Sequence, residues 1–255
     1  MIGFGQAGGK ILDRFLEYDQ RTGSEIVRAA VAVNSAKADL MGLENIPEEN
    51  RVLIGQARVK GHGVGADNEL AAEIAHESSE ELRNAVDSVS VAEIDAFLLV
   101  AGLGGGTGSG AGPVLARELK QGYTEPVYAL GILPGDEEGG IYTMNAARSL
   151  PTYAREVDNL LLFDNDAWRE TGESMEGGFE HINGELVQRF GVLFGAGEYA
   201  DGNPVAEGVV DSSEIINTLA GGGISTLGYA SSPVDTATAE VDSASATNQI
   251  TSLVR

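Results

Sequence analysis

The sequence predicts an α/β fold in which a parallel β-sheet is covered by helices on both faces. Short segments that are apolar throughout alternate along the chain with longer segments of helical periodicity. Strands that are buried on both faces of a parallel sheet are apolar throughout, whereas half-exposed strands alternate. Each apolar segment also closes on Gly, Asn or Asp, which favour turns. Strands and helices that alternate in this way indicate successive β-α-β units.

Strands are expected where the apolar segments lie, and helices between them. The expected strands are 26–35 (IVRAAVAVNS), 51–55 (RVLIG), 94–102 (IDAFLLVAG), 126–135 (PVYALGILPG) and 159–166 (NLLLFDND). The expected helices include 10–20, 69–89 and 113–120. Because ligands bind at the carboxyl ends of the strands in such sheets, the loops that follow the strands are the candidate site.

Charge and composition exclude several classes of partner. The chain has 255 residues, of which 39 are acidic and 16 basic, and a formal net charge of −23. It lacks the cluster of Lys and Arg that nucleic-acid binding needs, any cysteine, and an apolar run of the ~20 residues of a membrane helix. Acidic residues spread along the chain are typical of a surface that stays solvated at high salt. We therefore expect a cytoplasmic protein of a halophile, with no nucleic-acid partner and no transmembrane segment.

The strongest local feature is the glycine-rich stretch 101–114 (AGLGGGTGSGAGPV). It follows an apolar segment and leads into a helical pattern, so a strand, a glycine loop and a helix start are expected. A helix N-terminus carries free N–H groups and partial positive charge, and glycines before it let an anion lie directly on the backbone. Phosphate is the predicted ligand. The seven glycines are Gly102, Gly104, Gly105, Gly106, Gly108, Gly110 and Gly112.

Two further glycine loops lie at 3–9 (GFGQAGG) and 60–69 (KGHGVGADNE). The first satisfies G-x-G-x-x-G, but a dinucleotide site needs an acidic residue after the second strand, where Asn34 and Ser35 stand. A P-loop is also excluded, because Phe4 replaces its first glycine and Ile11 its Ser/Thr. Three such loops favour one polyphosphate held by several backbones. The alternative is that each glycine only permits a tight turn.

The stretch GGGTGSG (104–110) resembles the phosphate-loop signature of the tubulin/FtsZ superfamily of GTPases. Further segments resemble the other nucleotide loops and the central helix of that family, in the same order along the chain. These segments are GFGQAGGK, AVNSAKADL, GHGVGADNE, PGDEEGG, FDNDAW and FEHINGELVQRFG. Within the superfamily the sequence is most similar to the archaeal tubulin-like CetZ proteins.

The resemblance implies that GTP and GDP are the ligands, with Mg²⁺ as the cation of phosphoryl transfer and no metal-ligating side chain assigned. Glu138 matches the carboxylate that contacts the ribose, and Asn165 an asparagine that contacts guanine. Phe179 and Asn183 share one helix face, where the ring can stack on guanine and the amide can read its edge; the alternative is a core aromatic and a polar surface residue. The implied contacts are Gly5, Gln6, Ala7, Gly8, Asn34, Gly63, Gly65, Ala66, Gly104, Gly105, Gly106, Thr107, Gly108, Glu138, Asn165, Phe179 and Asn183.

The resemblance also places the water-activating group on a neighbouring subunit. The segment VVDSSEIINTL resembles the catalytic loop, with Asp211 and Glu214 at its acidic positions. Three residues apart at a helix start, both carboxylates can face one water. The same spacing also suits a helix-capping box, and both roles can hold together.

The expected organisation is a GTP-binding domain at 1–175, a central helix at 176–196, and the catalytic loop with the start of an incomplete carboxyl-terminal α+β domain at 197–255. The expected function is a GTPase that self-associates head-to-tail into cytoskeletal protofilaments and acts in archaeal cell shape; the sequence identifies no accessory partner. Tyr142 stands where FtsZ has an arginine, which disfavours a division-ring role. The alternatives are a GTP-binding scaffold with little turnover and an NAD-dependent oxidoreductase.

Overall fold

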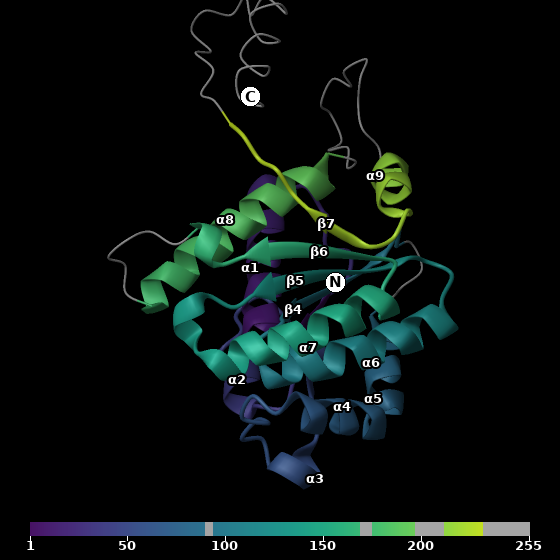
Figure 1. Cartoon of the computed structure of the whole chain (residues 1–255). Coiled ribbons are helices and arrows are strands. Elements are labelled where there is room, and N and C mark those ends of the chain that lie inside the picture. Colours follow the sequence, from purple (N-terminus) through teal and green to yellow (C-terminus); the bar gives the residue numbers. More distant parts are fainter. Residues whose placement is uncertain (90–93, 169–174, 197–211, 232–255) are drawn as a thin grey trace, which may run out of the picture.

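The computed structural model describes residues 1–89, 94–168, 175–196 and 212–231. Its centre is a parallel sheet of seven strands in the order β3-β2-β1-β4-β5-β6-β7 (Figure 1). The strands are β1 (Ile2–Phe4), β2 (Val31–Asn34), β3 (Arg51–Leu53), β4 (Phe97–Gly102), β5 (Val127–Leu133), β6 (Asn159–Asp164) and β7 (Ile224–Thr226). The five expected strands are thus confirmed, with β1 and β7 at either end of the described chain.

The helices connect these strands and cover the sheet. They are α1 (Gly5–Thr22), α2 (Lys37–Met41), α3 (Gln56–Val59), α4 (Asn68–Glu77), α5 (Ser79–Ser88), α6 (Gly106–Gly122), α7 (Gly140–Glu156), α8 (Met175–Gly195) and α9 (Ser212–Leu219). Short 3-10 turns lie at Glu48–Asn50, Asp136–Glu138 and Asp166–Trp168. No helix in these described ranges is long and apolar enough to cross a membrane.

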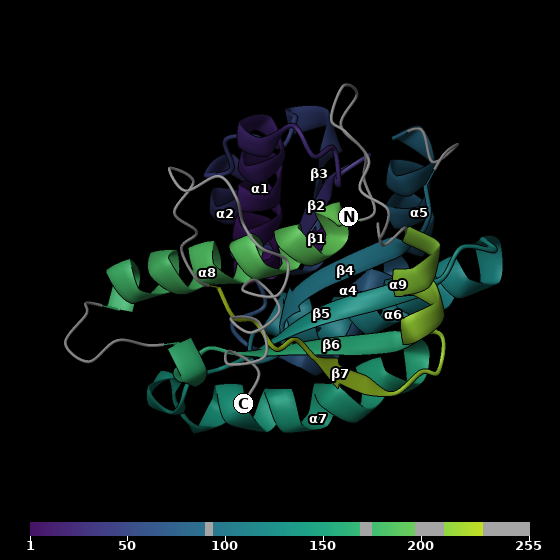
Figure 2. The ribbon, with the colours of Figure 1, turned by 90° about the horizontal axis from the view of Figure 1, so that it is seen from above.

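Both faces of the sheet are buried, as the sequence predicts. Along β4, Leu99 packs in one apolar cluster with α4, α5, α6 and α7, whereas Leu98 and Val100 pack in a second cluster with α1, α8 and α9. Figure 1 shows α7, α6 and α4 below the sheet and α8 above it, and in Figure 2 α8 runs across the sheet beside α1. Burial on both sides explains why the strands are apolar throughout.

All three expected helices differ from their expected bounds. The helix expected at 10–20 is α1, which begins earlier, at Gly5, and ends at Thr22. The helix expected at 69–89 is two helices, because Ser78 ends α4 with φ −100° and ψ 13° and α5 starts at once after it. The helix expected at 113–120 begins earlier, at Gly106, so the larger part of the glycine-rich stretch is helix rather than loop. Pro113 therefore lies inside α6.

The strand order creates a switch point between β1 and β4. The chain runs from β1 through α1 to β2 on one side, and returns from β3 to β4 on the other side of β1. Crossover connections on the two sides leave a crevice at the carboxyl ends of β1 and β4, which is where ligands bind in doubly wound sheets. The glycine-rich segment 3–9 lies at the end of β1, and the segment 101–114 lies at the end of β4.

Candidate nucleotide-binding site

Two helix N-termini meet at the switch point. α1 begins at Gly5 directly after β1, and α6 begins at Gly106 after β4. The two starts are so close that a Cβ on Gly5 would lie 3.3 Å from the backbone nitrogen of Gly108. The first N–H groups of each helix have no carbonyl partner within the helix and carry partial positive charge. Their convergence makes this edge of the sheet suited to a polyphosphate.

Most glycines of the stretch 101–114 have a packing role. A Cβ on Gly105 would meet only the carbonyl oxygen of Gly102, at 3.9 Å, so only here does the glycine backbone face open space at the start of α6. The glycines of this stretch therefore have two different roles. Gly105 leaves room for an anion, and the other glycines let neighbouring parts of the protein pack closely. The nearest atoms to an added Cβ would lie at 3.0 Å for Gly104, 2.4 Å for Gly106, 2.6 Å for Gly108, 2.1 Å for Gly110 and 1.7 Å for Gly112.

Glycines of the first loop, residues 3–9, also have packing roles. A Cβ on Gly8 would lie 2.1 Å from the carbonyl oxygen of Val100, so this glycine lets α1 pack directly on β4. Gly5 has a φ of +69°, a left-handed conformation that favours glycine. Gln6 and Ala7 are exposed at the start of α1, where a ligand can reach them.

We expect the Gly110→Ala variant to lose stability without a change in the nucleotide-facing surface. The added methyl group would collide with the backbone carbonyl of Asn68 at the start of α4, and overpacking of this kind typically costs about 1–3 kcal/mol. Thermal unfolding in molar KCl measures the loss. Gly122→Ala is the matched control, because an added Cβ at that end of α6 meets no atom within 4 Å. Equal stability of the two variants would contradict the packing role.

Asn34 and Thr107 belong to a buried hydrogen-bond network between the end of β2 and the start of α6. The Thr107 hydroxyl lies 2.8 Å from the Ser35 hydroxyl and 3.5 Å from Oδ1 of Asn34. Asn34 also accepts from the Ala36 N–H at 3.1 Å and donates to Asp39 at 3.0 Å. Asn34 and Thr107 are only 3% and 6% exposed. The side chains of Asn34 and Thr107 thus already have protein partners and hold the end of β2 to the start of α6, so their direct contact with nucleotide stays a prediction.

The third loop closes over the start of α6. Gly63 and Gly65 have φ of +81° and +59°, and Ala66, which is not glycine, has φ +65°. A non-glycine residue in this conformation is strained and persists only where its surroundings hold it. Here Asn145 donates to the Ala66 carbonyl at 2.7 Å. A Cβ on Gly106 would meet Val64 at 2.4 Å, so this loop packs directly on the glycine helix.

Three polar side chains on one face of α7, which the sequence analysis missed, donate hydrogen bonds to backbone carbonyls of the glycine-rich stretch. Asn145, Ser149 and Tyr153 are spaced four residues apart and are all buried. Asn145 donates to the Gly104 carbonyl at 3.0 Å, Ser149 to that of Leu103 at 3.3 Å, and Tyr153 to that of Gly108 at 2.5 Å. Burial raises the pKa of Tyr153, so its hydroxyl stays a donor. Polar residues at i, i+4 and i+8 of a helix were the available signal.

The residues expected around the ribose and base form a second part of the site. Glu138, Asn165 and Phe179 line one small pocket with Gly135, Asp166, Gly178 and Ile182. Glu138 accepts from the Gly135 N–H at 2.8 Å, and the Asn165 amide lies 3.5 Å from the same carboxylate oxygen. The structure therefore brings together residues from the loops after β5 and β6 and from α8. Asn183 lies one turn beyond Phe179 on α8 and is half-buried.

Asp166 is another residue that the sequence analysis missed. Its carboxylate accepts from the Asp136 N–H at 2.7 Å, and a Cβ on Gly135 would collide with it at 2.6 Å. This bond ties the loop after β6 to the loop after β5. The two sides of the small pocket are thereby held at a fixed separation.

The catalytic residues expected on the neighbouring subunit lie away from these loops. Asp211 lies outside the described residues. Glu214 is on α9, which precedes β7 and lies at the amino-terminal ends of the strands (Figure 1). The glycine loops lie at the carboxyl ends, beyond the six residues of β4, a span of about 20 Å. Glu214 therefore cannot reach the phosphate loops of its own chain.

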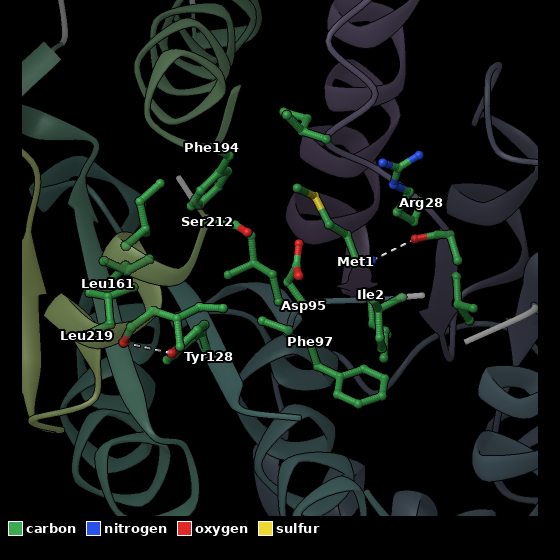
Figure 3. A pocket seen from close by; sticks show the side chains of 18 of the residues that line it. Met1, Ile2, Arg28, Asp95, Phe97, Tyr128, Leu161, Phe194, Ser212 and Leu219 are labelled. Carbon is green, nitrogen blue, oxygen red and sulfur yellow. Dashed lines mark hydrogen bonds between the residues drawn. The ribbon is translucent and has the colours of Figure 1, made fainter. Parts of the chain in front are cut away.

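A separate apolar cavity lies at the α9 edge. Figure 3 shows Ile2, Phe97, Tyr128 and Phe194 around it, and the Met1 amino group donates to the Ala29 carbonyl at 2.6 Å. Its lining is mostly apolar, with Arg28, Asp95 and Ser212 as polar members. The two ends of the sheet thus present different surfaces, one with helix N-termini and one with apolar side chains and α9.

Comparison with known proteins agrees with this arrangement. A family model of the tubulin/FtsZ family GTPase domain matches residues 1–173, and one of the tubulin-like CetZ carboxyl-terminal domain matches residues 172–255. The tubulin-like protein CetZ1 of Haloferax volcanii is 66% identical over 272 aligned positions, which cover 100% of this chain and 69% of CetZ1. CetZ3 of the same organism is 59% identical, with coverage of 100% and 69%.

Solved structures show the same fold. The GDP-bound monomer of CetZ1 from Haloferax volcanii has a TM-score of 0.90 at 67% identity and covers 100% of this chain and 71% of that chain. CetZ2 from that organism, in a GTPγS-bound protofilament, has a TM-score of 0.80 at 52% identity, with coverage of 88% and 63%. By sequence, by fold and by the order of its loops, this chain belongs to the tubulin-like CetZ proteins of the tubulin/FtsZ family of GTPases.

Proposed function

We propose that this chain binds GTP at the carboxyl ends of β1, β4, β5 and β6 and hydrolyses it at junctions between head-to-tail copies. The observation that carries the proposal is the shared sheet edge of two features. The N-termini of α1 and α6 provide backbone donors for phosphates, and the pocket of Glu138, Asn165 and Phe179 provides groups for a ribose and a base. A nucleoside triphosphate has these same two parts.

The phosphates would lie over Gly105 and the first turns of α1 and α6. Gly105 leaves open space there, and Gln6 and Ala7 are accessible from the other side. Backbone N–H groups at helix starts bind phosphate without a basic side chain. Backbone donors are important at this site because Tyr142, which lies beside Gly104, supplies no positive charge.

A divalent cation would be held mainly through the nucleotide. The part of the chain that the structure describes has no cluster of three or more His, Asp or Glu residues that could hold a metal ion. Mg²⁺ commonly binds through substrate phosphates and waters, with few protein ligands. The site is compatible with Mg²⁺ that would arrive with GTP and would neutralise charge that develops in phosphoryl transfer.

The separation of the two sheet ends supports hydrolysis between subunits. Glu214 lies at the end opposite the glycine loops, so it can approach a nucleotide only on another copy. Contact between two different ends of the same chain is heterologous, and such contacts build filaments when they do not close into a ring. The GTPγS-bound protofilament of CetZ2, at 52% identity, supports the same arrangement. We also propose a role in cell shape in the cytoplasm of a halophile. This proposal rests on the membership of the chain in the CetZ proteins.

The test is the nucleotide that copurifies with the protein, and its turnover. Nucleotide extracted from protein prepared in molar KCl and separated by ion exchange is expected to be GDP or GTP. Phosphate release per subunit is expected to rise with protein concentration, because each site needs a neighbour. Extraction of NAD or ATP would contradict guanine binding, and bound GTP without any release would make the protein a GTP-binding scaffold.

A further inference from the structure

A buried arginine on α8 is stacked between two aromatic rings. The guanidinium carbon of Arg189 lies 3.8 Å from the ring centroid of Trp168 and 4.8 Å from that of Tyr229. Trp168 in turn stacks on Phe163 of β6, with centroids 6.1 Å apart and an angle of 14° between the rings. Arg189 is only 8% exposed. The column links the end of β6, the central helix and the segment after β7.

The polar contacts of Arg189 do not explain its burial. Its Nη1 donates to the Glu185 carbonyl at 2.8 Å and to the Glu185 carboxylate. Its Nε is buried and has no hydrogen-bond partner among the described residues. A buried guanidinium that leaves one N–H without an acceptor contributes little to the stability of a fold. Replacement by an apolar side chain of similar volume often leaves the stability unchanged. The contact that distinguishes Arg from such a side chain is the cation over the indole ring.

Trp168 is one anchor of the loop that carries Asn165. The backbone N–H of Trp168 donates to the Asn165 carbonyl at 3.3 Å and closes the short turn Asp166–Trp168. On the other side, Asp166 accepts from the Asp136 N–H at 2.7 Å. Asn165 thus lies between an anchor on the β5–α7 loop and an anchor on α8. Its amide faces the pocket that holds Glu138 and Phe179.

We infer that Arg189 is a positioning residue for base selection, which clamps Trp168 and thereby fixes the orientation of the Asn165 amide. The inference rests on the proposed function, in which Asn165 contacts the base. An asparagine side chain has an oxygen acceptor and an NH₂ donor, so it can pair with either purine edge if it is free to turn. Guanine is preferred over adenine only while the amide is held in one orientation. Loss of the clamp therefore costs selectivity more than phosphate affinity.

The test compares binding of GDP and ADP by Arg189→Met, Arg189→Lys and the wild type in molar KCl. Methionine keeps an unbranched apolar stem but removes the guanidinium cation, so the ratio of the ADP and GDP dissociation constants is expected to fall about tenfold. Arg189→Lys retains a cation and is expected to keep most of the ratio. Gln188→Met is the control for position, because it introduces methionine one residue away on α8 without removing a cation, and its ratio is expected to equal that of the wild type.

A second readout comes from Trp168, the single tryptophan of the chain. Its emission maximum in the GDP-bound protein is expected to shift in Arg189→Met and not in Gln188→Met, since only the first variant removes the cation over the ring. In a double-mutant cycle with Trp168→Leu, the loss of selectivity is expected to be non-additive, because Arg189 acts through Trp168. A merely structural role would lower the melting temperature and leave the selectivity ratio unchanged.

The outcomes separate the two proposals. A wild type that prefers GDP, together with an unchanged ratio in Arg189→Met and additive losses in the cycle, would overturn the clamp and leave the proposed function standing. A wild type with no preference for GDP over ADP would overturn the proposed function and the clamp with it. A reduced ratio in Gln188→Met equal to that of Arg189→Met would also overturn the clamp, since the effect would then belong to α8 as a whole.

Discussion

Replacement of Gly105 by aspartate is expected to abolish nucleotide binding while the domain remains as stable as before. Gly105 is the N-cap of α6, with φ −74° and ψ 165°, a conformation that any residue adopts. An added Cβ meets no atom closer than 3.9 Å, so the side chain fits without strain. Aspartate is also a favoured N-cap residue, better than glycine by a few tenths of a kcal/mol.

The loss of binding follows from charge. The carboxylate would compete for the same N–H groups that the phosphates need, and it would repel them. Two unit charges about 5 Å apart, at an effective dielectric constant of about 20, interact by about 3 kcal/mol, which corresponds to more than a hundredfold in affinity. The rise in melting temperature that GDP causes in the wild type measures binding, and this rise is expected to vanish in Gly105→Asp.

Gly105→Asn is the control for shape. Asparagine has nearly the same size as aspartate and also caps helices, but it carries no charge. Its binding is expected to be weakened much less than that of Gly105→Asp. If both variants bind GDP as tightly as the wild type, the phosphates do not lie over the start of α6.

The second large effect is expected for Glu214→Ala, whose phosphate release should fall by about 10²–10⁴-fold, the range for loss of a positioned general base. Its own nucleotide pocket lies at the other end of the sheet, so GDP binding is expected to be unchanged. Filaments of this variant are expected to persist longer, because hydrolysis no longer triggers their disassembly. Glu214→Gln is the matched control that keeps the side-chain size and hydrogen bonding and is expected to be equally slow.

Mixing the two variants shows which subunit supplies the carboxylate. Gly105→Asp has no nucleotide of its own but carries Glu214, so it can complete the pocket of a Glu214→Ala neighbour. Phosphate release is expected to recover in the mixture, and co-sedimentation checks that the two proteins assemble. Co-assembly without recovery would show that Glu214 does not act on a neighbour, and a helix-capping role would remain. Gly105 serves here better than Gly106, where an added side chain would meet Val64 and displace the third loop.

The sequence predicts the sheet well, and three of the residues that it names for the site line one pocket in the structure. Strands such as Val127–Leu133 are apolar on both faces, and only a sheet buried on both sides explains that pattern. The order of motifs along the chain points to Glu138, Asn165 and Phe179, which line one pocket in the structure, and their contact with ribose and base stays a prediction. The helix break at Ser78 was not predicted, since serine occurs inside helices as well as at their ends.

The supporting contacts could not be predicted, because they depend on three-dimensional proximity. Nothing local to Gly112 shows that Tyr153 will lie against it, and nothing local to Trp168 shows that Arg189 will cover its ring. The glycine-rich stretch indicates close approach but not what approaches. In the folded chain a strand, a helix and a tyrosine make most of these approaches, and only Gly105 is left for a ligand.

The division of the pocket between early and late segments has a consequence for newly made protein. A ribosome releases α6, the proposed phosphate-binding helix, well before Phe179 of α8, so an emerging chain has half of the proposed pocket for part of its synthesis. Amino-terminal regions can begin to fold while the remainder is still being made. Tight nucleotide binding must then wait until the central helix has docked across the sheet. On the proposed function, a filled nucleotide pocket therefore requires a chain whose synthesis has passed α8.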